Sequence, residues 1–120
     1  MARANAQPRM LPAEPDAVAM VAKFFRALSD PVRLRLLEFL LDGEHTVTEC
    51  VAYAGLSQGR VSTHLGCLSD CGYVQVRRQG KHAYYRIADA RVAQLVRLAH
   101  TLAAQNHEAL CSCHRIPNAA

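Results

Sequence analysis

The stretch SQGRVSTHLGCLSDC, residues 57–71, decides the fold because it predicts one amphipathic helix. Its apolar residues recur at the spacing of a single helical face: Val61, Leu65 and Leu68. Ser57 stands where a side-chain oxygen can accept a backbone N–H of the first turn. Gly72 follows the last residue, where the left-handed conformation that ends many helices costs glycine little. The sequence therefore predicts this helix with both of its ends.

A second stripe on the same helix carries its chemistry. It consists of residues in steps of four, three and four: Arg60, His64, Cys67 and Cys71. The front of the helix has groups that can contact DNA, and its back has two thiols on one face. Residues four apart on a helix have Cβ atoms about 5–6 Å apart, so two thiolates there can approach one ion.

The flanking segments predict a helix-turn-helix followed by a β-hairpin. Residues 46–54 predict a short helix, and Gly55-Leu56 a tight turn before the central helix. Residues 73–78 alternate and predict a strand, Gln79-Gly80 a turn, and residues 83–87 a returning strand. The hairpin tip is basic: Arg77, Arg78, Lys81 and His82. Beside a helix-turn-helix, a basic hairpin is typical of a wing that contacts phosphate.

Two further helices precede this unit and one follows it. Residues 16–28 predict a helix capped by Asp16, and Asp30-Pro31 starts a second helix that Gly43 ends. Asp89 caps the final helix. The long apolar face of that helix consists of Val92, Leu95, Val96, Ala99, Leu102 and Ala103. Because the domain already has its core helices, we expect this face to bind a second copy of the chain.

Length and composition limit the possible classes. A chain of 120 residues predicts one domain, and its net charge of +4 suits an anionic partner. No apolar run approaches the roughly 20 residues that span a bilayer, and no secretory signal is visible, so we expect a cytoplasmic protein without a membrane partner. Five cysteines, an odd number, argue against a disulfide framework. They leave metal ligands, a reactive thiol or small buried hydrophobic residues as alternatives.

The order of these elements resembles the ArsR/SmtB family of winged-helix metal-sensing repressors. LSDPVRLRLLEFL at 28–40 is similar to the second helix of that family, LSQGRVSTHLGCLSDCGYV at 56–74 to its recognition helix, and RRQGKHAYYRI at 77–87 to its wing. The resemblance implies a mainly α fold with a small β-hairpin, a winged helix-turn-helix. It also implies a homodimer held by the first and last helices. It covers residues 16–110, which we expect to form one DNA-binding and dimerisation domain. The preceding residues 1–15 hold three of the five prolines and predict a flexible arm, and residues 111–120 form a cysteine-bearing tail.

The family implies repression of metal-resistance operons and release from DNA when a metal binds, but its members place their ligands differently. One arrangement has Cys-Val-Cys before the turn, where this chain has Thr46-Val47-Thr48. We interpret the nearby Cys50 as a core residue. Another has ligands along the last helix. Asp89 is present there, but the positions of its companions hold Arg91, Leu102 and Gln105, and we expect His100 and His107 to be solvated.

A third arrangement, that of the cadmium- and lead-sensing members of the family, matches best. It has two cysteines late in the recognition helix, here Cys67 and Cys71, and one in the tail. The expected tail position falls at Ser112, between Cys111 and Cys113, so either or both can complete the site. The resemblance implies that the tail ligand can come from the partner chain.

Sulfur ligands favour thiophilic ions, so we expect cadmium, lead, mercury or trivalent arsenic as the inducer, although zinc also accepts sulfur. His64 and His114 are weaker candidates for a nitrogen ligand than the thiols. No organic cofactor is expected.

The DNA-binding residues follow from the same helix and hairpin. The front of the recognition helix should face the major groove of a palindromic operator, through Ser57, Gln58, Arg60, Ser62, Thr63 and His64. The wing should contact phosphate through Arg77, Arg78 and Lys81.

Other classes of function are weighed against this one. A thiol redox sensor of the same fold would release DNA on oxidation and would have a depressed thiol pKa. An enzyme with a cysteine nucleophile needs a positioned base. The sequence has no nucleophile motif, oxyanion loop or phosphate loop, so we expect no enzyme. A metal buffer or chaperone would need neither the basic wing nor the polar front of the recognition helix.

Overall fold

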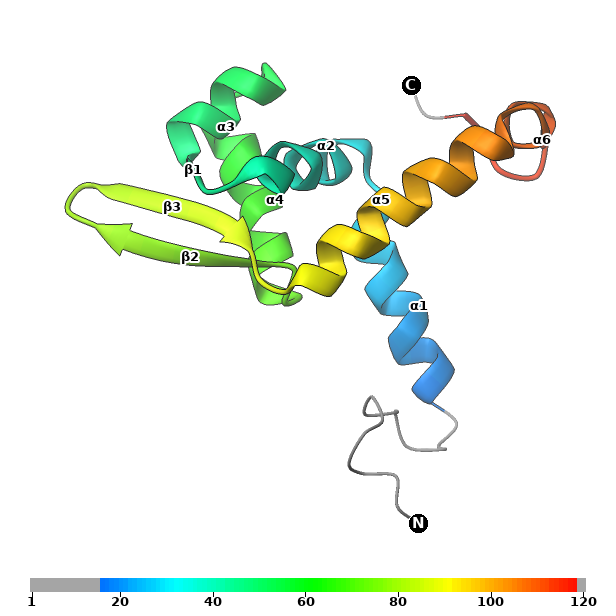
Figure 1. Cartoon of the computed structure of the whole chain (residues 1–120), viewed down its shortest axis with the longest axis horizontal. Coiled ribbons are helices and arrows are strands. Elements are labelled where there is room, and N and C mark those ends of the chain that lie inside the picture. Colours follow the sequence, from blue (N-terminus) through cyan, green and yellow to red (C-terminus); the bar gives the residue numbers. More distant parts are fainter. Residues whose placement is uncertain (1–15, 119–120) are drawn as a thin grey trace, which may run out of the picture.

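The predicted recognition helix is α4, Gln58–Asp70, at the centre of the computed structural model, which describes residues 16–118 (Figure 1). The Ser57 hydroxyl oxygen accepts the backbone N–H of Arg60 at 3.3 Å, and Gly72 has the left-handed φ of +85°. Both predicted ends of the helix are therefore confirmed. Its apolar stripe is fully buried: Val61, Leu65 and Leu68.

The other elements of the described residues precede and follow α4 in the predicted order. They are α1 (Ala17–Leu28), α2 (Pro31–Phe39), the 3₁₀ turn η2 (Leu40–Asp42), β1 (His45–Thr46), α3 (Val47–Ala54), β2 (Val74–Gln79), β3 (His82–Ile87), α5 (Ala90–Gln105) and α6 (His107–Ser112). The predicted arm at 1–15 lies outside the described residues. None of the described helices is long and apolar enough to cross a membrane.

The core lies between α2, α3 and α4. Asp30 begins α2 as predicted, because its carboxylate accepts the backbone N–H groups of Val32 and Arg33 at 2.8 and 3.1 Å. Leu36 and Leu37 are fully buried, and so is Cys50. The interpretation of Cys50 as a core residue is confirmed. Burial, together with the nearby negative charge of Glu49, raises the pKa of the Cys50 thiol to about 11, so this thiol is a packing group.

The sheet is antiparallel in the order β1-β3-β2, and β2 and β3 form the projecting wing in Figure 1. Gln79 pairs with His82, so the turn consists of Gly80 and Lys81. The predicted turn at Gln79-Gly80 is wrong by one residue, because the left-handed Gly80, with φ of +61°, occupies the first turn position. Tyr73, predicted to begin the first strand, instead precedes it and is fully buried.

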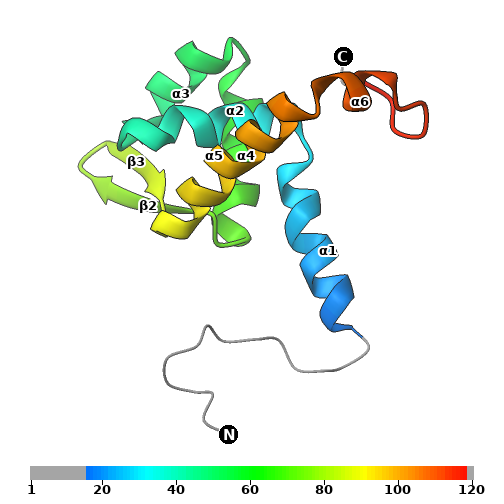
Figure 2. The same ribbon diagram turned by 45° about the vertical axis from the view of Figure 1, so that its right-hand side comes forward.

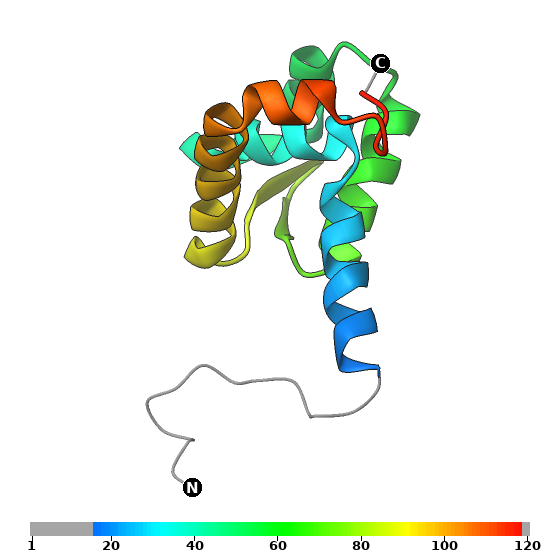
Figure 3. The ribbon, with the colours of Figure 1, turned by 90° about the vertical axis from the view of Figure 1, so that its right-hand side faces the viewer.

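Helix α1 extends away from the core, as Figures 1, 2 and 3 show. Asp16 occupies the N-cap position of α1 as predicted, but its side chain makes no capping hydrogen bond. Within one chain the predicted apolar face is largely uncovered, with Val18 78% and Phe25 53% exposed.

The last predicted helix is broken into α5 and α6. The Asn106 side-chain amide donates to the Leu102 carbonyl oxygen at 2.8 Å and ends α5 at Gln105. Asp89 caps α5 as predicted, accepting the backbone N–H of Arg91 at 2.8 Å. Cys111, assigned to the tail from the sequence, lies in α6 instead, and only Cys113 follows that helix. The second half of α5 is exposed, including Leu98 and Leu102.

Candidate nucleic-acid interface and metal centre

The front of α4 and the tip of the wing together form one polar groove. The residues of α4 predicted to face DNA are exposed, except His64, which is half-buried: Ser57, Gln58, Arg60, Ser62 and Thr63. A cavity of about 400 Å³ lies between them and the wing. Its lining includes Gln58, Ser62, Arg78 and Lys81, along with His82 of β3. The structure thus places two predicted helix residues and two predicted wing residues around one groove.

Arg77, the third predicted wing residue, is held by contacts within the chain. Its Nε and Nη2 atoms donate to the Glu44 carboxylate at 3.1 and 2.8 Å, and Nη1 donates to the Gln79 side chain. Its guanidinium also lies 4.5 Å from the centre of the Tyr84 ring. The hydrogen bonds to Arg77 lower the pKa of Glu44, so this carboxylate stays ionised. No sequence motif indicates Glu44, because its contact with Arg77 joins residues 33 positions apart.

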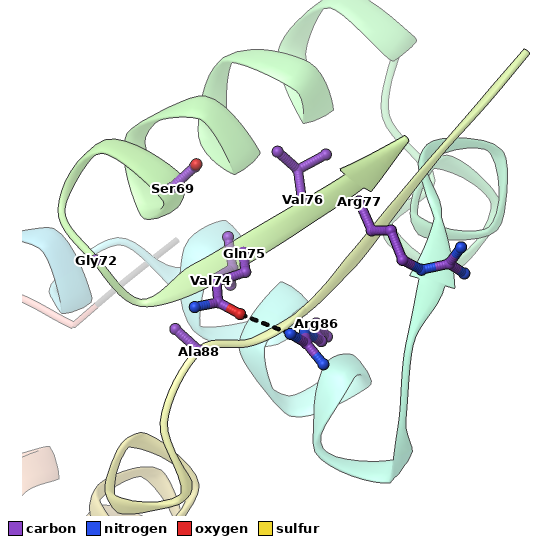
Figure 4. Close-up of a pocket in the computed structure, with 8 residues that line it drawn as sticks. All are labelled: Ser69, Gly72, Val74, Gln75, Val76, Arg77, Arg86 and Ala88. Atoms are coloured by element: carbon purple, nitrogen blue, oxygen red, sulfur yellow. Dashed lines mark hydrogen bonds between the residues drawn. The ribbon is translucent and has the colours of Figure 1, made fainter. Parts of the chain in front are cut away.

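A second cavity, of about 610 Å³, lies between the end of α4 and the wing (Figure 4). Ser69 and Gly72 line it from the side of α4, and Arg86 from β3. Across this cavity the Arg86 guanidinium donates to the Gln75 side-chain oxygen at 2.9 Å. This hydrogen bond links the two strands at the base of the wing, so we assign the cavity a structural role.

Cys67 and Cys71 form the predicted pair at the end of α4. Cys67 is half-buried and Cys71 is exposed. Partial burial raises the pKa of Cys71, and the adjacent Cys67 raises it further, while Lys23 of α1 acts in the opposite direction. The Cys71 thiol is therefore protonated at neutral pH. Deprotonation must accompany metal binding there.

The two remaining candidate ligands, Cys111 and Cys113, lie at the other end of the molecule. Figures 1 and 2 both show α6 beyond the far end of α5, away from the end of α4 that carries Cys71. Within residues 16–118, no three side chains of His, Cys, Asp or Glu converge on a metal position. One chain therefore presents pairs of ligands, and the complete set predicted from the sequence does not assemble within it.

The histidines differ in their contacts. Nδ1 of His64 is 3.4 Å from Nη1 of Arg33, and the His100 ring contacts the Glu38 carboxylate of α2. His107 lies with Nε2 3.5 Å from the Cys111 sulfur. His100 and His107 were predicted to be solvated, but each contacts a side chain. The spacing of four between His107 and Cys111 could have indicated their contact.

Comparison with known proteins gives concordant matches. Residues 30–76 match the family described as bacterial regulatory protein, arsR family. The chain is 62% identical over 96 residues to the probable mercury resistance operon repressor of Streptomyces lividans, covering 80% of this chain and 77% of that protein. It is 40% identical over 74 residues to the transcriptional regulator CmtR of Mycobacterium tuberculosis, covering 62% and 63%.

A solved structure agrees with the fold. The homodimeric winged helix-turn-helix DNA-binding domain Mb0332 from Mycobacterium bovis, a possible ArsR-family regulator, matches with a TM-score of 0.70. It is 26% identical in sequence, and the match covers 95% of this chain and 100% of that one. The predicted winged helix-turn-helix fold is confirmed.

Proposed function

This chain belongs to the ArsR family of bacterial regulatory proteins, and on that basis we propose that it represses transcription as a homodimer and leaves its operator when a thiophilic metal ion binds. The observation that carries the proposal is the position of the thiol pair. Cys67 lies in the last turn of α4 and Cys71 directly follows that helix, whose exposed front forms the candidate DNA surface.

Dimerisation follows from the uncovered apolar faces of α1 and α5. Val18 and Phe25 on α1, and Leu98 and Leu102 on α5, are exposed in one chain. Burying such residues is favourable by roughly 25 cal/mol per Å² of apolar surface. The solved structure of Mb0332 is described as homodimeric, which supports the same assembly here. A two-fold dimer presents two α4 helices to half-sites about 10–10.5 base pairs apart.

DNA recognition is assigned to the groove between α4 and the wing. Arg60 and Gln58 on the exposed front of α4 can form bidentate hydrogen bonds with guanine and adenine, respectively. Arg78 and Lys81, across the groove from Gln58 and Ser62, can contact phosphate and fix the register of the helix.

The metal is bound by the thiols of Cys67 and Cys71 together with a cysteine of the C-terminal segment, Cys111 or Cys113. Soft sulfur ligands suit mercury, cadmium, lead or trivalent arsenic. The similarity to a probable mercury resistance operon repressor supports a metal as the inducer. Because α6 lies far from Cys67 and Cys71 in one chain, the C-terminal ligands come from the partner subunit.

Release from DNA follows from the shared helix. An ion that binds Cys67 and Cys71 together with a ligand of the C-terminal segment restrains α4 in an orientation that no longer fits the operator. By linkage, operator DNA weakens metal binding by the same factor. A 100-fold effect requires about 2.7 kcal/mol of coupling, which is within the usual range for allostery.

A thiol redox sensor remains the second candidate. Oxidation of Cys67 and Cys71 would also alter the end of α4. The pKa of Cys71 is raised by partial burial and by Cys67, whereas a redox sensor would have a depressed thiol pKa.

Ultraviolet titration of the reduced protein with mercury, cadmium and lead tests the proposal, with operator release followed by fluorescence anisotropy. Cys67→Ser/Cys71→Ser should lose the sulfur-to-metal absorption bands and operator release together. Cys50→Ala, at the thiol that packs in the core, serves as the thiol control. If the double variant still leaves the operator on adding metal, the proposal is wrong. Release by oxidant that is reversed by a metal-free reductant would establish the redox alternative.

A further inference from the structure

The C-terminal segment holds a histidine nitrogen and a cysteine sulfur at the separation of two ligands of one metal ion. The Cys111 sulfur lies 3.5 Å from Nε2 of His107 and 4.0 Å from Nδ1. We propose that His107 and Cys111 form a half-site, which joins Cys67 and Cys71 of the partner subunit to give a metal centre with three sulfurs and one nitrogen. This inference rests on the proposed function and specifies its ligand set.

The distance between the two atoms fits a shared ion. A zinc-type centre has bonds of about 2.3 Å to sulfur and about 2.0–2.1 Å to nitrogen. At a tetrahedral angle these bonds place sulfur and nitrogen about 3.6 Å apart. The observed 3.5 Å is close to that value, but the sulfur also lies 4.0 Å from Nδ1, so the imidazole must rotate to point Nε2 at a shared ion.

The pair is also available for a ligand. Both side chains are exposed, and His107 has Cys111 as its side-chain contact. The other histidines with ring contacts in the described helices and strands have no thiol beside them. His45 and His100 contact carboxylates, His64 contacts an arginine, and His82 contacts the Tyr84 ring. His107 thus combines an accessible ring nitrogen with a neighbouring thiol.

The two pairs have complementary numbers of ligands. Cys67 and Cys71 supply two sulfurs one helical turn apart, and His107 and Cys111 supply a nitrogen and a sulfur at the same spacing of four. A closed zinc-type site has four ligands. Within residues 16–118 of one chain no three candidate ligands meet, so two pairs from different subunits are the simplest way to reach four.

The structure also distinguishes the two C-terminal cysteines. Cys111 lies within α6 beside His107, whereas Cys113 follows the helix and is half-buried. Helix α6 has no buried residue, and the break at Asn106 separates it from α5. It can therefore reorient as a unit toward a partner while keeping the His107–Cys111 pair together. We assign Cys111, and not Cys113, as the C-terminal sulfur ligand.

A nitrogen ligand should affect metal preference. An imidazole suits borderline, four-coordinate ions, whereas an all-sulfur set favours softer ones. His107→Gln should weaken binding of zinc and cadmium about tenfold, as measured by chelator competition, and should weaken mercury binding by less than about threefold. His114→Gln, a histidine in the same segment without the thiol contact, is the matched control and should leave all three affinities unchanged.

Cadmium-113 NMR identifies the ligand atoms directly. The full-length reduced protein, labelled with ¹⁵N and loaded with ¹¹³Cd, should show coupling between the ion and Nε2 of His107. Cys111→Ser should remove one of three thiolates from the ultraviolet bands, whereas Cys113→Ser should retain all three. Because α6 has no buried residue, these variants should unfold at the same urea concentration as the wild type.

Two results would overturn the half-site while leaving the proposed function intact. One is an unchanged ¹¹³Cd spectrum and unchanged affinities in His107→Gln, and the other is loss of the third sulfur in Cys113→Ser instead of Cys111→Ser. By contrast, operator release that persists in Cys67→Ser/Cys71→Ser overturns the proposed function itself. The two failures are therefore distinguishable.

Discussion

Arg33 of α2 joins the end of α1 to the recognition helix through His64. Its Nη1 atom lies 3.4 Å from Nδ1 of His64, and its Nε donates to the Ala27 carbonyl oxygen at 2.6 Å. Since the guanidinium can only donate, Nδ1 of the neutral imidazole accepts and Nε2 carries the proton. The neutral His64 ring can then donate from Nε2 to DNA.

Arg33→Met should therefore lower operator affinity without unfolding the protein. A hydrogen bond with a charged group contributes about 1.5–3 kcal/mol, so we expect a loss of about tenfold or more in affinity by fluorescence anisotropy. Arg35→Met, at an exposed arginine of the same helix, is the control for lost charge. Equal losses in the two variants would show that Arg33 acts only through its net charge.

The contact between Glu44 and Arg77 predicts that the two adjacent wing arginines differ. Arg77 is bound to the Glu44 carboxylate, whereas Arg78 lines the groove beside α4. Each phosphate neutralised contributes about 0.9 to the slope of log affinity against log salt. Arg78→Gln should reduce that slope by about 0.9 per subunit, and Arg77→Gln should reduce it much less. The opposite order would mean that Arg77 leaves Glu44 when DNA binds.

Local signals predicted most of the elements, since their causes lie within a few residues. Ser57 caps the start of α4, Gly72 follows its end, and the Asp30 carboxylate caps the start of α2. The errors have different causes. The two-residue strand β1 pairs with β3, which lies far along the chain. The break after Gln105 is accompanied by hydrogen bonds from Asn106 to Leu102 and Ala103, a local feature that no proline or glycine indicates.

The residues of the candidate site could be predicted from the sequence, but their arrangement in space could not. The spacing of four between Cys67 and Cys71 predicted the thiol pair, because residues at that spacing share one face of a helix. The contacts of Arg33 with His64 and of Glu44 with Arg77 each join segments about thirty positions apart, 31 and 33 respectively. Such pairs require the packed helices and the folded wing, which periodicity does not describe.

The environment of His45 predicts a contribution to stability that is lost as pH rises above about 6.5. Partial burial alone lowers its pKa, but hydrogen bonds and charges from Asp42 and Glu49 outweigh burial and raise the pKa above its usual 6.5. Its ring nitrogens lie 3.0 and 3.2 Å from those carboxylates. A raised folded-state pKa means that this stabilisation is complete below pH 6.5 and is lost as pH rises through the folded-state value.

Urea unfolding of the wild type and His45→Gln between pH 5.5 and 8.5 measures this effect. The difference in unfolding free energy between the two proteins should be largest at the acidic end and shrink as pH rises. Taking the difference removes the contributions of the other histidines. A difference that stays constant over this range would show that the charge of His45 contributes nothing.

The hydroxyl of Tyr73 anchors α1 to the rest of the domain. It donates to the Phe24 carbonyl oxygen at 2.7 Å, and the Tyr73 and Phe24 ring centres are 4.8 Å apart. Tyr73→Phe keeps the ring and removes only this hydrogen bond, so it should lower the free energy of unfolding by about 1 kcal/mol. Urea unfolding at one fixed protein concentration measures it, because the stability of a dimer depends on concentration.

The same change should weaken dimerisation, because α1 carries exposed apolar residues such as Phe25. A less restrained α1 loses more conformational freedom when the partner binds, so sedimentation equilibrium should show a higher dimer dissociation constant for Tyr73→Phe. Tyr53→Phe is the control, since Tyr53 stacks on Phe39 of α2, away from α1. Lower stability with an unchanged dimer constant would place the interface on α5 alone.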